Sequence, residues 1–332
     1  MIRFNELPKV ELHCHLDGCL RTRTVIELAK KESVKLESLE YDKVEDMLVV
    51  PEYCASLDVY LRRFDLPGLL MQNKENLKRV SYELIEDVSR ENVKYIEIRF
   101  APLFHLEGGL STDEVIDAIL EGMKDGEKDF GVKSNLIICV MRHHDLDCGY
   151  KLIDDCKKFI GKGVVGVDLA GCELEGFVPQ YEEMFKKARE YGFKVTVHAG
   201  ETGFSQNVVD AINILKADRI GHAVALQDDE VAYNLVKEKK ITLEMCPKSN
   251  MDTKATSSYK MHPFRRFLND GLEVNLSTDN RTVSNIDLVT ECRNLNNADE
   301  LSYEDYKKMY LNSVRGSFCD NETKAWLKSL IY

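Results

Sequence analysis

The segment Lys-Val-Glu-Leu-His-Cys-His-Leu-Asp-Gly, residues 9–18, lies close to the start of the chain. Its apolar residues alternate with polar ones, which is the two-residue period of a β-strand. The alternation predicts that His13 and His15 project from one face, as two imidazoles must in order to bind one metal ion. Asp17 follows on the same side, and Gly18 permits a turn out of the strand. A His-x-His pair alone is weak evidence, so the remaining ligands have to come from elsewhere in the sequence.

Seven further apolar segments follow, separated by segments with helical spacing of apolar residues. The predicted strands cover residues 93–100, 135–141, 164–169, 194–198, 219–226, 241–246 and 272–277. Repeated strand–helix units indicate a parallel sheet, and eight of them predict an α/β fold of the (β/α)8 TIM-barrel type with additional helices. An open, doubly wound sheet is the structural alternative, but no Gly-x-Gly-x-x-Gly follows the first strand. We expect residues 1–332 to form a single domain.

The net charge limits the kinds of partner that the protein is expected to bind. A net charge of −12 argues against nucleic-acid or anionic-membrane partners, because phosphate binding needs a basic surface. No stretch approaches 18 apolar residues, and residues 1–8 lack the apolar core of a signal peptide. We therefore expect a cytoplasmic protein that acts on a small molecule and has no obligate protein partner.

Ten cysteines are scattered along the chain without a Cys-x-x-Cys pair. This spacing gives no support to a zinc ribbon or to thioredoxin-like chemistry. We expect small buried thiols of a reducing compartment.

Polar residues gather at the C-terminal ends of the predicted strands, where barrel enzymes carry their chemistry. His13 and His15 end strand one, His198 ends strand five and Asp279 follows strand eight. Three imidazoles and one carboxylate meeting at a barrel mouth predict a site for one divalent ion. Strand four has no Lys at its tip to bridge a second ion, which favours a single metal.

Two further residues point to hydrolysis. A bound Zn²⁺ would lower the pKa of its water towards neutrality. His222, one strand further round, is expected to take or hold the proton of that water, and Glu201 is expected to be a proton donor in the same cavity. We expect Glu97, Arg99 and Glu244 to be buried or rim-level polar residues. The remaining histidines, at positions 105, 143, 144 and 262, are expected at ordinary surface positions.

Five motifs in order resemble the adenosine deaminase family of the amidohydrolase barrel superfamily, from about residue 8 onward. They are His13-Cys-His15-Leu-Asp17-Gly18, Asp168-Leu-Ala-Gly171, His198-Ala-Gly-Glu201, Arg219-Ile-Gly-His222 and Ser277-Thr-Asp279.

The resemblance implies a metal site at the C-terminal mouth of the barrel and hydrolytic deamination of adenosine, and of 2′-deoxyadenosine, in purine salvage. By position, one Zn²⁺ would be held by His13, His15, His198 and Asp279. Glu201 would protonate purine N1, and water activated by the zinc, oriented by His222 and Asp279, would add to C6 with loss of ammonia. Gly171 would donate its backbone N–H to purine N3, while His15 and Asp17 would lie near the ribose hydroxyl.

The sequence departs from the family pattern at Asn280, where many members carry a second Asp. That acid is expected to bond purine N7, an acceptor, which an Asp can do only when protonated. Asn carries a permanent N–H₂ donor, so the substitution preserves the contact. A smaller departure is Ala223, where Gly is frequent.

Several alternatives remain open at this point. The same site would serve a deaminase of adenine, of methylthioadenosine or of another 6-aminopurine nucleoside. An AMP deaminase is disfavoured by the acidic charge. A ring-opening amidohydrolase would not require the acid at Glu201, and a catalytically inactive barrel would be expected to have lost a ligand.

Overall fold

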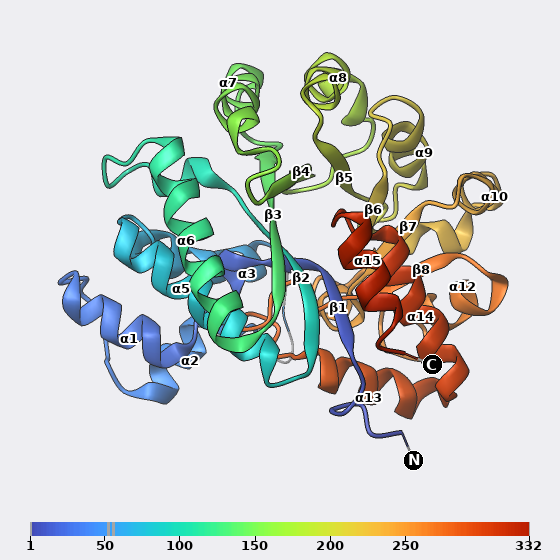
Figure 1. Ribbon diagram of the computed structural model, residues 1–332, viewed down its shortest axis with the longest axis horizontal. Coiled ribbons are helices and arrows are strands. Elements are labelled where there is room, and N and C mark those ends of the chain that lie inside the picture. The colour runs from blue at the N-terminus through green and yellow to red at the C-terminus, as the bar shows by residue number, and fades with distance from the viewer. Residues whose placement is uncertain (1, 52–53, 55–56, 332) are drawn as a thin grey trace.

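The computed structural model describes residues 2–51, 54 and 57–331 of the chain. Eight parallel strands form one sheet in which each strand pairs with the next in sequence. The strands are β1 Lys9–His15, β2 Val93–Phe100, β3 Lys133–Met141, β4 Val164–Ala170, β5 Lys194–Ala199, β6 Arg219–His222, β7 Thr242–Met245 and β8 Glu273–Leu276. Helices lie around the outside of the strands, with α7 to α10 following one another along one side (Figure 1). The predicted (β/α)8 barrel is confirmed.

The helices before β5 are α1 Thr22–Lys31, α2 Tyr41–Leu48, α3 Leu57–Leu61, α4 Asp65–Leu70, α5 Lys74–Ser89, α6 Thr112–Phe130, α7 Leu146–Cys156 and α8 Glu182–Tyr191. Those after β5 are α9 Ser205–Asn213, α10 Glu230–Lys239, α11 Pro247–Asp252, α12 Phe264–Asp270, α13 Leu288–Asp299, α14 Tyr303–Gly316 and α15 Asn321–Lys328. Local sequence explains the sharpest boundaries. Ser111 and Glu114 form a capping box at the start of α6, and Gly131 ends it with a φ of +72°.

The barrel closes where the chain leaving β8 meets β1. The Asp279 N–H donates to the carbonyl of His13 (2.9 Å), and the His15 N–H donates to the carbonyl of Asp279 (2.8 Å). Asp279 has a φ of +61°, in the left-handed region that residues other than glycine seldom adopt. The seam therefore brings predicted ligands from opposite ends of the chain side by side.

Strand β6 is shorter than the sequence predicts. We expected a strand over residues 219–226, but β6 ends at His222, and a 3₁₀ helix occupies Val224–Asp228. The reason is that His222 and Ala223 have φ values of +66° and +54°, which break the extended conformation. The left-handed backbone accounts for the frequency of Gly at the position of Ala223, because this conformation costs a residue other than glycine roughly 1–2 kcal/mol. The sequence pattern does not predict the short helices α2, α4 and α11.

The interior of the barrel contains charged side chains as well as apolar ones. Arg99 bonds Asp168 (2.8 Å) and Glu244 (2.7 Å), and all three are fully buried. Arg219 pairs with Glu97 and Glu244, each at 2.5 Å. The expectation that Glu97, Arg99 and Glu244 are buried polar residues is confirmed. Because a buried ion needs a partner, these residues constrain one another's positions.

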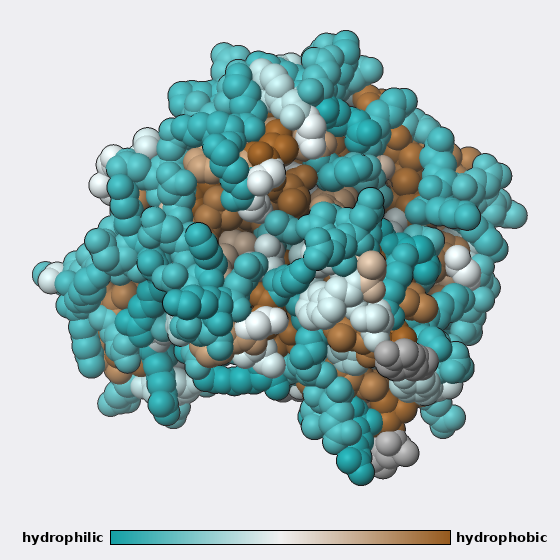
Figure 2. Space-filling view, viewed as in Figure 1, coloured by the Kyte–Doolittle hydropathy of each residue, from teal (hydrophilic) through white to brown (hydrophobic). Residues whose placement is uncertain are grey.

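The face seen in Figure 2 is mostly hydrophilic, with apolar side chains in scattered hollows. No helix in the described part of the chain has the length and apolarity needed to cross a membrane. All ten cysteines are free, and eight are buried, but Cys148 and Cys172 are exposed, so the expectation of buried thiols is wrong for these two. Cys148 lies near the start of α7, and Cys172 lies two residues after the end of β4.

Candidate active site

Four side chains converge on one point at the C-terminal mouth of the barrel. The possible ligand atoms of His13, His15, His198 and Asp279 all lie within 4.8 Å of one another. Asp279 Oδ1 is 3.3 Å from His13 Nε2 and 3.4 Å from His15 Nε2. His15 Nε2 is 3.2 Å from His198 Nε2. The buried His13 Nε2 has no hydrogen-bond partner among the described residues, so the donor set fits a cation.

Buried acids orient two of these imidazoles from behind. Glu244 Oε2 lies 2.8 Å from His13 Nδ1, and Asp168 Oδ1 lies 3.0 Å from His198 Nδ1. Such contacts fix the tautomer in which Nε2 is free to bind a metal. Burial favours the neutral form of Glu244, but the cations of Arg99 and Arg219 outweigh it and hold its pKa well below the ordinary value.

The protonation states suit metal binding. Burial lowers the pKa of His15 well below its ordinary value, which favours the neutral imidazole. Burial acts in the opposite direction on Asp279, but the neighbouring imidazoles of His13 and His15 outweigh it and hold the Asp279 pKa well below normal. Metal ligands must be deprotonated, so both residues are in the required form at neutral pH.

Glu201 lies in the loop after β5, next to the histidine cluster. Its Oε1 accepts a hydrogen bond from the Thr253 hydroxyl (2.9 Å), and its Oε2 is 3.7 Å from His222 Nε2. Thr253 follows α11 directly, so the chain after β7 supports the side chain of Glu201. The carboxyl keeps hydrogen-bonding capacity for a ligand, as a proton donor needs.

A chain of hydrogen bonds determines which nitrogen of His222 carries the proton. The Phe264 N–H donates to His262 Nδ1 (3.3 Å), so the proton of neutral His262 must be on Nε2. His262 Nε2 donates to Asn250 Oδ1 (3.1 Å), and Asn250 Nδ2 donates to His222 Nδ1 (3.0 Å). Burial, followed by the charge of His222, lowers the His262 pKa to about 3 and keeps that ring neutral. Neutral His222 is therefore protonated on Nε2, the nitrogen nearest Glu201.

The cluster opens into a cavity of about 630 Å³. Every predicted site residue except His13, which is fully buried, lines it, namely His15, Asp17, Gly171, His198, Glu201, His222, Asp279 and Asn280. The structure thus brings together the residues that the sequence singled out. Asn280 Nδ2 donates to the hydroxyl of Tyr60 (2.9 Å), which leaves its second hydrogen for the cavity.

Two histidines expected at the surface are buried, and that expectation is wrong. His105 is fully buried, stacks on Phe100 with 5.7 Å between ring centroids, and has its Nε2 3.5 Å from Asp17 Oδ1. His262 is buried and belongs to the chain of hydrogen bonds that reaches His222 through Asn250. His105 ends a short 3₁₀ helix after β2 and His262 lies in the connection between α11 and α12, where sequence periodicity does not reveal burial. His143 is exposed and His144 partly so, as expected.

Sequence reasoning missed Glu173 and Tyr60, which also line the cavity. Glu173 comes two residues after Gly171, so its place beyond the end of strand four was an available signal. Tyr60 lies on α3, and its contact with Asn280 spans 220 residues of sequence, which no local pattern reveals.

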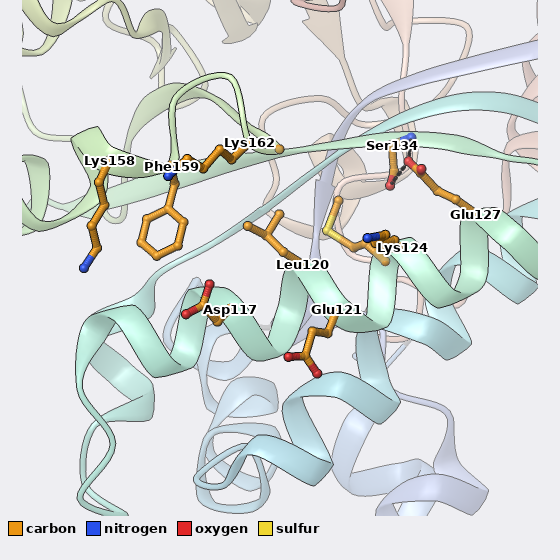
Figure 3. A pocket seen from close by; sticks show the side chains of 11 residues that line it. Asp117, Leu120, Glu121, Lys124, Glu127, Ser134, Lys158, Phe159 and Lys162 are labelled. Atoms are coloured by element: carbon orange, nitrogen blue, oxygen red, sulfur yellow. Dashed lines mark hydrogen bonds between the residues drawn. The ribbon is translucent and has the colours of Figure 1, made fainter.

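A separate hollow of about 610 Å³ lies on the outer wall of the barrel. Figure 3 shows Asp117 and Leu120 of α6 facing the segment of Lys158, Phe159 and Lys162, while Glu127 lies beside Ser134. Glu127 already accepts hydrogen bonds from the backbone N–H and hydroxyl of Ser134. The polar lining is a mixture of acids and lysines, so the barrel mouth remains the better candidate.

Comparison with known proteins gives a consistent assignment. The family model described as adenosine deaminase matches residues 8–332. An adenosine deaminase of Clostridium perfringens is 59% identical over 322 residues, covering 97% of each chain. An adenosine deaminase of Clostridium botulinum is 50% identical over 330 residues, covering 99% of this chain and 98% of the relative.

Solved structures share the fold. The adenine deaminase of Arthrobacter aurescens superimposes with a TM-score of 0.91 at 23% identity, over 98% of both chains. An amidohydrolase of Burkholderia ambifaria with bound Zn gives a TM-score of 0.86 at 27% identity, over 98% of this chain and 90% of that one. The family model and the curated relatives match nearly the full length of this chain, which therefore belongs to the adenosine deaminase family of hydrolases.

Proposed function

We propose that this chain converts adenosine and 2′-deoxyadenosine to inosine and 2′-deoxyinosine with release of ammonia, as a step of purine salvage in the cytoplasm. The proposal includes one Zn²⁺ held by His13, His15, His198 and Asp279, and a single catalytic domain over residues 1–332. The observation that carries it is the convergence of these four ligand atoms within 4.8 Å beside the carboxyl of Glu201.

The metal has a defined chemical purpose in this proposal. When bound at such a site, a zinc ion lowers the pKa of a coordinated water and so supplies a nucleophile near neutral pH. The buried, unpartnered Nε2 of His13 and the zinc in the Burkholderia ambifaria relative support zinc as the ion.

The chain's own residues orient and protonate the purine. Glu201 donates a proton to N1, which makes C6 electrophilic. Among the described residues only Thr253 donates a hydrogen bond to its carboxyl, which leaves the other oxygen available. The Gly171 N–H bonds N3, and the free amide hydrogen of Asn280 bonds N7. His15 and Asp17 lie near the ribose hydroxyl, and the contact between Asp17 and His105 supports a fixed orientation of that carboxylate.

His222 holds the attacking oxygen rather than abstracting its proton. The relay from His262 through Asn250 occupies Nδ1 of His222 and leaves the proton on Nε2. A neutral imidazole in this tautomer donates a hydrogen bond into the cavity. This supports an orienting role for His222.

The cavity lining favours an uncharged small-molecule substrate. Apart from histidine, the charged side chains among its described lining residues are carboxylates, including Asp17, Asp65 and Glu107. A 5′-phosphate would be repelled there, so we propose a nucleoside in preference to a nucleotide.

The test is an ultraviolet scan of purified protein with adenosine, 2′-deoxyadenosine, adenine and methylthioadenosine, before and after chelation. We expect adenosine and 2′-deoxyadenosine to be converted to inosine and 2′-deoxyinosine. This activity should be lost on chelation and restored by Zn²⁺. Turnover of adenine or methylthioadenosine alone would move the substrate assignment and keep the proposed mechanism. No turnover of any 6-aminopurine by the zinc-loaded protein would contradict the proposal.

A further inference from the structure

The loop that carries Glu201 is bound to a second, buried carboxylate. Glu173 Oε1 accepts hydrogen bonds from the Gly200 N–H (2.7 Å) and from the Asn207 side chain (2.9 Å). Glu173 Oε2 accepts from the N–H groups of Glu201 and Thr202, both at 2.9 Å, and from the Thr202 hydroxyl (3.0 Å). Three consecutive backbone N–H groups thus point at one side chain, an arrangement that binds anions well.

The bonding leaves Glu173 no free lone pair for chemistry. The residue is only 5% exposed, and all five groups that contact its carboxylate are hydrogen-bond donors. Glu201 differs, because only the Thr253 hydroxyl among the described residues donates to its carboxyl. Of these two glutamates, Glu201 is free to donate a proton and Glu173 is not.

In the proposed mechanism, Glu173 also joins the two strand ends that contact N1 and N3 of the bound purine, the ring nitrogens on either side of C2. It follows Gly171 after β4 and bonds the backbone on both sides of Glu201 after β5. Asn207 of α9 strengthens this connection between the two strand ends, because its side chain also bonds the Gly176 N–H and the Leu174 carbonyl, each at 3.0 Å. The distance between the N3 donor and the N1 acid therefore depends on this contact.

We propose that Glu173 is a positioning residue, which holds the Glu201 loop at the distance from Gly171 that the purine ring requires. The inference rests on the proposed function, because it assigns Glu201 and Gly171 the contacts described there. Proton transfer needs close alignment, and a displacement of about 1 Å can lower a rate by about 100-fold.

The substitution Glu173→Gln tests this contact. Its amide N–H₂ would face N–H and O–H donors in place of an acceptor, so at least two of the five hydrogen bonds would be lost. We expect kcat for adenosine to fall about 10–100-fold, while KM changes less and the bound zinc stays near one per chain. Glu173→Asp keeps the charge but is shorter by one methylene, so we expect an intermediate loss from this milder variant.

A double-mutant cycle with Glu201→Gln separates positioning from a general loss of structure. If Glu173 acts through Glu201, the double variant will have the same kcat as Glu201→Gln alone, within about twofold. Asp218→Asn is the matched control, since Asp218 accepts the Val195 N–H (2.9 Å) at the opposite end of β5. We expect that control to retain the kcat of the unmodified protein.

The outcomes distinguish this inference from the proposed function. Loss of activity in Glu201→Gln together with a kcat within twofold of normal in both Glu173 variants would overturn the inference alone. Losses that multiply in the double variant would also overturn it. If the unmodified protein does not deaminate adenosine, the proposed function fails. Amide hydrogen exchange then tests whether Glu173 holds the Glu201 loop. We expect faster exchange at Gly200–Thr202 in Glu173→Gln, and unchanged exchange would contradict the contact.

Discussion

His13 Nδ1 lies 2.8 Å from Glu244 Oε2, and both side chains are fully buried inside the barrel. Glu244 also pairs with Arg99 and Arg219, so the orientation of a metal ligand is linked to the ionic network of the interior. Contacts of this kind fix the ring and raise its basicity, and their loss typically weakens metal binding 10–100-fold. We expect Glu244→Gln to weaken zinc binding by roughly that factor, as measured by competition with a chromogenic chelator.

A matched control is available in the same network. Glu97 is equally buried and pairs with Arg219, but it bonds none of the four proposed ligands. Glu97→Gln should therefore lose stability to a similar extent while its zinc affinity stays within about threefold of normal. Equal zinc affinities of the two variants would refute the assigned role of Glu244.

The tautomer of His222 can be observed directly. We expect ¹⁵N NMR of histidine-labelled protein to show neutral His222 protonated on Nε2, because Asn250 donates to Nδ1. Asn250→Asp replaces that donor with an acceptor, so Nδ1 should become protonated. An Nδ1 signal that is already of the protonated type in the unmodified protein would contradict the relay.

The amide of Asn280 makes a distinct prediction for the pH profile. An Asp at this position can donate to purine N7 only when protonated, whereas the N–H₂ of Asn donates at every pH. We expect Asn280→Asp to remain active but to lose kcat/KM as the pH rises through the pKa of the new acid. Asn280→Ala, the control, should lose the contact equally at every pH, and an unchanged profile in Asn280→Asp would refute the N7 contact.

The sequence alone predicts those parts of the site whose residues follow the periodicity of a secondary-structure element. His13 and His15 share a face because a strand has a period of two, and the ends of parallel strands meet at one mouth. Asp279 could be assigned to the same mouth from its place after strand eight, although its left-handed backbone at the barrel seam could not be foreseen.

Contacts between distant segments explain what the sequence did not reveal. His262 reaches His222 only through Asn250, and Glu173 bonds a loop that begins 27 residues later. His105 lines the cavity and is buried against Phe100, on which it stacks, while its own sequence context is that of a surface turn. Such positions depend on tertiary packing, which local patterns do not encode.

A buried carboxyl outside the active site predicts how stability depends on pH. Glu291 on α13 is fully buried, accepts the Lys248 N–H (2.8 Å) and is bonded by the hydroxyl of Tyr259. Burial raises its pKa to about 7, from 4.5 for an ordinary glutamate. The folded protein therefore binds this proton more tightly than the unfolded chain does. Its contribution to stability is complete below about pH 4.5, declines as the pH rises and is lost above about pH 7.

Glu291→Gln isolates this effect, because the amide keeps an acceptor for the Lys248 N–H and cannot ionise. We expect the variant to gain up to about 3 kcal/mol in unfolding free energy relative to the unmodified protein at pH 8, and less than about 1 kcal/mol at pH 5. Urea unfolding at the two pH values measures the difference, with the exposed Glu190→Gln as the control that should change stability by less than about 0.5 kcal/mol at either pH. An equal effect of Glu291→Gln at both pH values would show that this carboxyl does not titrate between them. A loss of stability at pH 8 would show that Lys248 and Tyr259 stabilise the charged carboxylate in the folded protein.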